Sequence, residues 1–359
     1  HYNLNNSPLS QENLNEDRLL IIDEIGYCPD AFQMLAALQY TGEFPHIITI
    51  SSNPVTKEML DLYYHIPVFP MQFNEFLIAI AKDWYIEAII THFETNKKIP
   101  DIVHKELINL FNLYLIIGGM PGVINEYLNF DNLLNITEYH MFLLSTYRNN
   151  INNICSDSDA LKMNQVLSSI PFQLIKENRK FQYKLIRKGT THTMYKDAIK
   201  NLTDINYIIP SYKISSEELS GLYTTIKENK LNVNEITSFK LYFSDVGILH
   251  SLLSKQLNHP FDDIAKKALL ENYVAKTLQA NGYPLMFWES GSTAKIDFLI
   301  PKEEGIIPVE LFIDNNTRSK SISVLKQKTD FSYAIKISAR NFGYSKNVKY
   351  VPYYAAFCL

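Results

Sequence analysis

Two neighbouring carboxylates follow a run of apolar residues near the start of the sequence. The segment RLLIIDEIG (18–26) predicts a strand buried on both faces that ends at Asp23 and Glu24. Parallel α/β sheets bind ligands at the carboxyl ends of their strands, so these side chains are candidates for a nucleotide site. In a strand of the Walker B type the Asp helps to hold Mg²⁺ and the Glu polarises the attacking water. Asp23 is therefore the candidate magnesium ligand, acting through the bound nucleotide, and Glu24 is the candidate general base.

A second apolar run also ends in polar side chains. HIITISSNP (46–54) predicts another buried strand, followed by Ser51, Ser52 and Asn53. Ser52 or Asn53 could sense the γ-phosphate or the attacking water, although a strand that simply ends in a turn explains the pattern equally well. Arg148, in TYRNN, is a candidate arginine finger, with a structural ion pair as the alternative.

The phosphate-binding loop that such a site requires is not found in the sequence. The pattern G-x-x-x-x-G-K-[ST] needs a Gly-Lys pair, and none of the twelve glycines is followed by lysine. The sequence begins with His1, and the 17 residues before Arg18 are polar and contain no glycine. We expect a segment carrying the loop to precede His1; the alternative is that the nucleotide site has been lost. ATP and Mg²⁺ are expected cofactors on this condition.

A second set of carboxylates lies near the C-terminus. Glu271 falls in a predicted helix, Asp297 in the strand KIDFLIP and Glu310 in the strand GIIPVELFI. This order resembles the PD-(D/E)xK nuclease fold, in which carboxylates bind Mg²⁺ and a lysine two residues after the last carboxylate activates water. That position is Phe312 here, and Lys295 is a poor substitute. The sequence therefore predicts an inactive nuclease-like domain, whose carboxylates either bind metal or pair with neighbours such as Lys295 or Arg318.

A basic stretch suggests contact with nucleic acid. Residues 159–213 predict a winged helix, with helices in ALKMNQVLSSI, PFQLIKEN and THTMYKDAIKNLTDI and a wing strand in YIIPSYKI. The third helix would be capped by Thr190 or Thr191. The alternative is a winged helix that only packs against its ATPase domain. The candidate phosphate-binding residues are Arg179, Lys180, Lys184, Arg187 and Lys188.

Composition sets broad limits on the function. The 359 residues are 46% hydrophobic and 20% charged, with a net charge of −4, so there is no general attraction to nucleic acid. No apolar run has the length of a membrane span, so no membrane partner is expected. Cys28, Cys155 and Cys358 are far apart and form no CxxC pattern, which favours a reducing cytoplasm.

Helical spacing dominates the middle of the chain. GYCPDAFQMLAALQY predicts a helix from Pro29, and FLIAIAKDWYIEAIITHF and IVHKELINLFNLYLI predict two more. IPVFPMQFNEFL predicts a strand, a proline and a helix that begins near Gln72. GGMPG (118–122) predicts a tight turn between helices.

These segments together resemble a known family. The run LIIDEIGYCPDAFQMLAAL, then ITISSNP and FPMQFNEFL, is similar to AAA-type ATPases fused to a DUF4143 domain, and GGMPGVINEYL, FKLYFSDVGIL, ENYVAKTLQANG and the ending VPYYAAFCL follow in the family's order. The resemblance implies an α/β multi-domain chain, with a partial P-loop sheet, a helical winged-helix-like middle and a nuclease-like α/β end. The expected regions are 1–72, 73–155, 156–250 and 251–359.

The resemblance implies an ATP-binding protein that acts as an ATPase if the phosphate loop is encoded. The alternatives are a non-catalytic DNA- or protein-binding module and a metal-dependent nuclease. The expected partners are a nucleotide, with DNA or another protein as further candidates.

Overall fold

The computed structural model describes residues 18–41, 44–52, 63–130, 132–231, 233, 236, 238–257, 261–291 and 294–359. The chain divides into two compact units, His1–Pro67 and Val68–Leu359, and each is described here by itself. Helices and mixed sheets are both present, which confirms the α/β multi-domain class.

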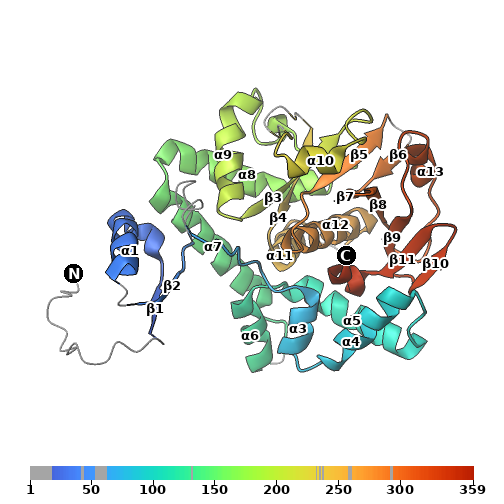
Figure 1. Cartoon of the computed structure of the whole chain (residues 1–359), viewed down its shortest axis with the longest axis horizontal. Helices are drawn as coiled ribbons and strands as arrows, with labels where there is room; N and C mark the ends of the chain where they lie inside the picture. Colours follow the sequence, from blue (N-terminus) through green and yellow to red (C-terminus); the bar gives the residue numbers. More distant parts are fainter. Residues whose placement is uncertain are drawn as a thin grey trace. The chain divides into compact units, whose positions relative to one another are not determined.

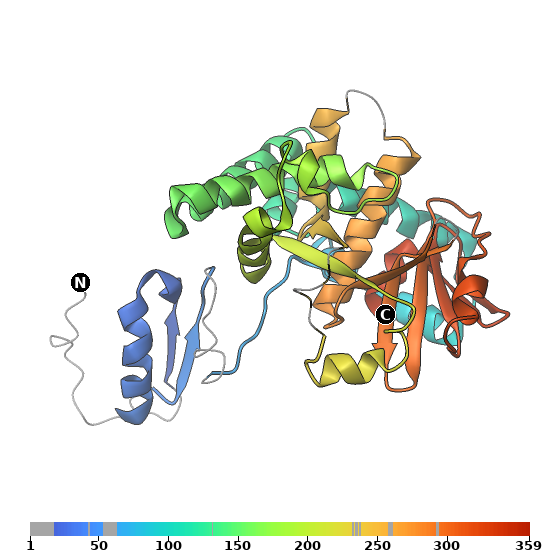
Figure 2. The same cartoon turned by 90° about the horizontal axis from the view of Figure 1, so that it is seen from above.

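The first unit contains two parallel strands and a helix (Figure 2). These are β1 (Leu19–Ile22), η2 (Ile25–Tyr27), α1 (Pro29–Thr41) and β2 (His46–Thr49), so the predicted strands and helix are confirmed. The prediction that these two strands are buried is wrong, because Leu19 and Ile21 of β1 are 49% and 57% exposed and Ile48 of β2 is 50% exposed. A parallel sheet is covered on both faces only when helices lie on both sides, and among the described residues of this unit α1 is the only α-helix.

The second unit is rich in helices (Figure 1). The helices form where apolar residues recur every three or four positions. The chain leaves the helical conformation at Ala81 and Gly118, whose φ angles are positive. The predicted strand before Gln72 is not formed, since residues 63–72 have no regular structure. The helices are α3 (Phe73–Ala79), α4 (Trp84–Thr95), α5 (Asp101–Ile117), α6 (Pro121–Phe130), α7 (Ile136–Ile154), α8 (Asp157–Leu174), α9 (His192–Asp204), α10 (Leu222–Lys227), α11 (Val246–Gln256), α12 (Asp263–Ala280) and α13 (Ser321–Lys326), with the 3-10 turns η3 (Tyr183–Leu185) and η5 (Tyr353–Cys358).

Two mixed sheets complete the second unit. Helix α12 is buried along most of its length and contacts strands of both sheets. The sheets approach each other at Asp297, the single residue between β6 and β7. One sheet has the order β4 (Phe239–Phe243), β3 (Ile208–Ile214), β5 (Met286–Ser290), β6 (Ala294–Ile296); the other has the order β10 (Gly343–Ser345), β11 (Val348–Pro352), β9 (Ala334–Ser338), β8 (Gly305–Leu311), β7 (Phe298–Lys302).

The predicted winged helix is only partly reproduced. The segment PFQLIKEN is not a separate helix, because α8 continues through Pro171 to Leu174. The predicted third helix is confirmed as α9, with Thr191 at its N-cap but without a side-chain capping bond. YIIPSYKI forms β3, which is not a wing at an edge: it lies between β4 and β5 and is hydrogen-bonded on both sides.

No single helix in the described part of the chain has both the length and the apolar character needed to cross a membrane. Helices α5 and α6 reach the required length and apolar character only when they are taken together, and this pair is bent by 115°. Their apolar faces, including Phe111 and Tyr114 of α5, are buried in the main core of the second unit.

Candidate functional site

Glu24 and Ser52 lie side by side at the carboxyl ends of β1 and β2. The backbone N–H and the hydroxyl of Ser52 both donate to Glu24 Oε2, at 3.0 and 2.9 Å. Glu24 has a φ of +50°, a left-handed conformation that is uncommon outside glycine and is found at functional sites. Asp23 precedes it with an exposed side chain. Asn53 lies outside the described residues.

Asp297 is at the centre of the C-terminal carboxylates. Its Oδ2 atom accepts a hydrogen bond from Lys267 Nζ at 2.9 Å and one from the backbone N–H of Leu311 at 2.7 Å. The ammonium of Lys267 also donates to the carbonyl oxygen of Leu311. The two side chains are only 17% and 14% exposed, so this ion pair is largely shielded from water.

Glu271 is fully buried on α12 and faces two cations. Its Oε2 atom accepts from Lys240 Nζ at 3.3 Å and from the hydroxyl of Tyr242 at 3.1 Å, and its Oε1 atom is 3.5 Å from the guanidinium of Arg179. Burial by itself would raise the pKa of Glu271, but the charges of Lys240, Arg179 and Lys267 outweigh it and hold the pKa below its usual value. Glu271 is therefore ionised at neutral pH.

Glu310 is paired across the sheet. It lies beside Lys336 in the register of β8 and β9, with Oε2 3.5 Å from Lys336 Nζ, while its Oε1 atom accepts from the hydroxyl of Ser319 at 2.6 Å. Burial raises the pKa of Glu310, and the nearby charge of Asp297 adds to this, whereas Ser319 and Lys336 lower it.

The structure thus brings the three predicted carboxylates together, and we call this group the carboxylate centre. Asp297 interacts with both Glu271 and Glu310. The cations that balance the centre were not among the predicted partners Lys295 and Arg318. They are Arg179, Lys240, Lys267 and Lys336.

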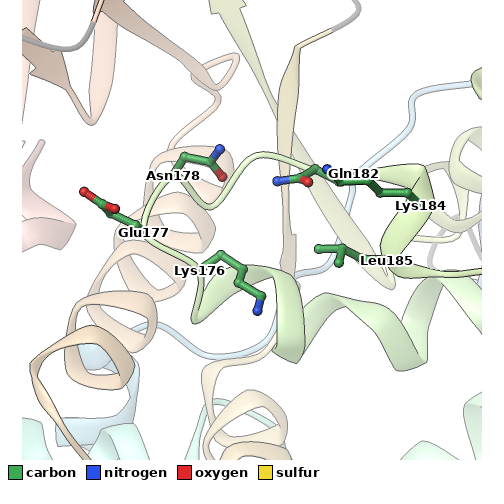
Figure 3. Close-up of a pocket in the computed structure, with 6 residues that line it drawn as sticks. All are labelled: Lys176, Glu177, Asn178, Gln182, Lys184 and Leu185. Carbon is green, nitrogen blue, oxygen red and sulfur yellow. The ribbon is translucent and has the colours of Figure 1, made fainter.

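The five basic candidates for nucleic-acid contact separate into two groups. Arg179 is paired with Glu271, and Lys180 Nζ is 2.5 Å from Glu289 Oε2, so both charges are already matched within the protein. Lys184, Arg187 and Lys188 are exposed. Lys184 borders a shallow hollow of about 370 Å³ between the end of α8 and η3 (Figure 3).

Arg148, the candidate arginine finger, projects from α7 toward α8. Its guanidinium donates to the hydroxyl of Ser168 at 3.3 Å. It lines an open hollow of about 510 Å³ together with Leu161 and Phe172, whose side chains are mostly exposed.

Comparison with known families locates the carboxylate centre within a described domain. Residues 266–356 match the family model of a domain of unknown function, DUF4143. The chain contains a DUF4143 domain. Residues 108–258 match a second family model, also a domain of unknown function, DUF8612. No curated protein and no solved structure matches the chain.

The DUF4143 part of the predicted resemblance is therefore confirmed. All three carboxylates of the centre lie in the DUF4143 domain, as do Lys267 and Lys336. Arg179 and Lys240 come from the region that matches DUF8612. The carboxylate centre is thus a buried electrostatic contact between the two domains.

A second polar cluster joins the same domains, and it was not predicted from the sequence. Gly119 donates its N–H to Asp245 Oδ2 and accepts from the N–H of Met71, both at 2.7 Å. The ammonium of Lys276, in the DUF4143 domain, donates to the Met71 carbonyl and the Tyr114 hydroxyl, both at 2.5 Å. Tyr114 in turn donates to Met71 at 2.7 Å. We call this cluster the glycine junction.

Glycine is required at this junction by close approach of other groups. A Cβ atom on Gly118 would be 2.3 Å from Asp245 Oδ1, and one on Gly119 would be 2.1 Å from the Met71 carbonyl. Burial lowers the pKa of Lys276 to about 8, while the charges of Asp245 and Glu75 oppose this shift. The Gly-Gly pair of GGMPG is the sequence feature that could have indicated this junction. The residues that the pair contacts could not be predicted, because Met71, Asp245 and Lys276 lie far away along the chain.

Proposed function

We propose that the protein is an ATP-binding protein of AAA type that hydrolyses ATP. In this proposal Asp23 orders Mg²⁺, Glu24 is the general base, and Ser52 senses the γ-phosphate, with Asn53 as the second candidate sensor. The observation that carries the proposal is the pair of hydrogen bonds from Ser52 to Glu24 at the carboxyl ends of two parallel strands. The DUF4143 domain supports it, since the family that the chain resembles joins this domain to an ATPase.

The chemistry assigns each group a distinct task. Ser52 fixes one oxygen of Glu24 and leaves the other oxygen available to accept a proton from an attacking water. The charge that develops on the phosphoryl group requires a phosphate loop and an arginine. The sequence contains no G-x-x-x-x-G-K-[ST] pattern, so in this proposal the phosphate loop is a further requirement. Arg148, or an arginine from a second copy, is the candidate finger.

Substitution of Glu24 by glutamine tests this proposal. In the full gene product we expect hydrolysis of ATP to fall on the order of 100-fold or more, because the amide cannot accept the proton, while ATP binding is retained. The measurements are steady-state phosphate release and nucleotide binding. Asp30→Asn, in the same unit and outside the proposed site, is the matched control and should behave like the wild type. Equal turnover by Glu24→Gln, or no ATP binding by the wild type, would contradict the proposal.

We further propose that the DUF4143 domain has a nuclease-like fold but does not cleave nucleic acid. The support is Phe312 in place of the lysine and the pairing of all three carboxylates with protein cations. Plasmid DNA incubated with the protein and Mg²⁺ or Mn²⁺ is expected to remain intact, as followed by gel electrophoresis. Cleavage that disappears in Asp297→Ala would overturn this expectation.

The alternative function is a non-catalytic module that binds DNA or another protein. One observation favours DNA: Lys184, Arg187 and Lys188 are all exposed, and Lys184 borders the hollow shown in Figure 3. If they contact phosphates, replacing all three by alanine should weaken binding to a duplex and reduce the slope of log K against log salt by about 3. A fluorescently labelled duplex titrated at several salt concentrations measures both. The matched control replaces Lys227, Lys230 and Lys328 by alanine and should leave the slope unchanged. An unchanged slope in the variant that lacks Lys184, Arg187 and Lys188 would reject the DNA interface.

We also propose that the protein acts in the cytoplasm. Cys28, Cys155 and Cys358 are all free thiols in the structure, which agrees with a reducing compartment.

A further inference from the structure

The hollow of about 510 Å³ beside Arg148 follows one face of helix α8, and we call it the α8 groove. Leu161, Ser168 and Phe172 line it from this helix, at the spacing of residues that share a helical face. Arg148 of α7 and Leu185 of η3 line it from neighbouring elements. From Leu161 to Phe172 the groove covers three turns of helix, or about 16 Å.

Three large apolar side chains of the groove are open to solvent. Leu161 is 60% exposed, Phe172 is 52% exposed and Leu185 is 38% exposed. Single exposed apolar side chains are common on protein surfaces, but these three line the same hollow. Apolar side chains gathered in a groove favour the burial of a partner's apolar side chains. Phosphate contacts, which supply most of the non-specific affinity for DNA, do not use them.

Arg148 brings a positive charge to the middle of the groove. Its guanidinium donates to the hydroxyl of Ser168, which lies between Leu161 and Phe172 on α8, at 3.3 Å. Within the described ranges of the chain no carboxylate pairs with Arg148. A guanidinium has five N–H donors and pairs best with a carboxylate, through two of them. The groove therefore favours an occupant that carries a carboxylate near its centre.

Further cations border the groove near the C-terminal end of α8. Leu185 also lines the hollow shown in Figure 3, together with Lys176 and Lys184, so the two hollows adjoin at this residue. Arg187 is exposed just beyond them, and Glu177 is the only acidic residue of this stretch. The surface complementary to the groove is thus apolar along its centre and negatively charged at its edge.

We propose that the α8 groove binds an acidic amphipathic helix of a partner protein, whose apolar side chains cover Leu161 and Phe172 and whose central carboxylate pairs with Arg148. A helix that lies along α8 presents every third or fourth side chain to the groove, in the order apolar, acidic, apolar. The inference does not rest on ATP hydrolysis, and it leaves an arginine from a second copy as the candidate finger.

Binding of synthetic peptides to the purified 359-residue chain tests the proposal. The probe is a fluorescein-labelled helical peptide of about four turns, with leucines at both ends of one face, a glutamate between them and further glutamates on its flank. One control peptide has the same composition in scrambled order, and another has lysine in place of every glutamate. Fluorescence anisotropy should give the acidic peptide a Kd at least about tenfold below that of either control.

Variants of the chain locate the binding. The double variant Leu161→Ser and Phe172→Ser should weaken binding of the acidic peptide at least about tenfold. Phe142→Ser removes a similarly exposed ring of α7 that lies outside the groove, and should bind like the wild type. Arg148→Met should weaken binding about fivefold, but should not change the affinity for a peptide whose central glutamate is glutamine.

Three results would overturn the proposal. One is a wild type that binds the acidic and scrambled peptides equally, or that binds the acidic peptide with a Kd above about 1 mM. Another is unchanged affinity in the double variant, with circular dichroism as the check on its folding. The third is a labelled DNA duplex that binds and is not displaced by the acidic peptide, which would assign the surface to nucleic acid. If the double variant does not fold, Phe172→Ser alone and Arg148→Met decide.

Discussion

Gly119→Ala is expected to lower the free energy of unfolding of the second unit by about 3 kcal/mol, the upper part of the range for overpacking. The added Cβ would be 2.1 Å from the Met71 carbonyl and 2.6 Å from Lys276 Nζ, so it cannot enter without moving backbone. Moving Met71 also weakens its hydrogen bonds with Gly119, Tyr114 and Lys276. Urea denaturation followed by circular dichroism measures the change.

Gly122→Ala provides a control within the same GGMPG segment. Gly122 lies in α6, and a Cβ there would meet the Tyr139 hydroxyl at 3.4 Å, an ordinary contact. Alanine also favours a helix over glycine by up to about 1 kcal/mol. Gly122→Ala should therefore be as stable as the wild type or slightly more so. Equal stability of the Gly119→Ala and Gly122→Ala variants would show that the junction is not closely packed.

Glu271→Gln is the second substitution with a large expected effect. Removing this buried charge leaves the cations of Arg179 and Lys240 without their carboxylate, and breaking a buried pair from one side costs about 3–5 kcal/mol. Because the amide keeps the shape of the side chain, we expect a loss near about 3 kcal/mol at pH 7. The same denaturation measurement applies, and a variant as stable as the wild type would contradict the assigned pairing.

The Glu271→Gln effect should depend on pH. The folded-state pKa of Glu271 lies below the ordinary value of 4.5, because nearby cations stabilise its charge. A carboxylate with a lowered pKa contributes stability that is complete above the unfolded value and is lost as the pH falls. The difference between wild type and variant should therefore shrink below about pH 4.5. Asp263→Asn, on the exposed side of the same helix, should change stability by less than about 0.5 kcal/mol throughout.

Local sequence patterns predicted the regular elements well. The strands β1 and β2, the helix from Pro29 and the turn at Gly118 all follow from short-range apolar spacing and breaker residues. The continuous helix through Pro171 was not predicted, since proline normally ends a helix and only packing of both flanking segments keeps it intact.

The partners of charged residues could not be predicted in the same way. Arg179 lies in a basic stretch, which is typical of a solvated or phosphate-binding surface, yet its partner Glu271 is 92 positions later. The sequence did identify Glu271, Asp297 and Glu310 as a group. It could not show that Lys267, rather than Lys295, supplies the nearest charge, because that depends on how α12 packs against β8.

The glycine junction has a consequence for the order of events during synthesis. Met71 forms hydrogen bonds with Gly119 and Tyr114, which follow it by fewer than fifty residues, and with Lys276, which is 205 positions away. A ribosome that adds roughly 5–20 residues per second needs on the order of 10–40 s to cover that distance. During this interval Met71 can form its hydrogen bonds with Gly119 and Tyr114, but not yet the one with Lys276. The ammonium that completes this set of hydrogen bonds comes from α12 and is made 205 positions after Met71.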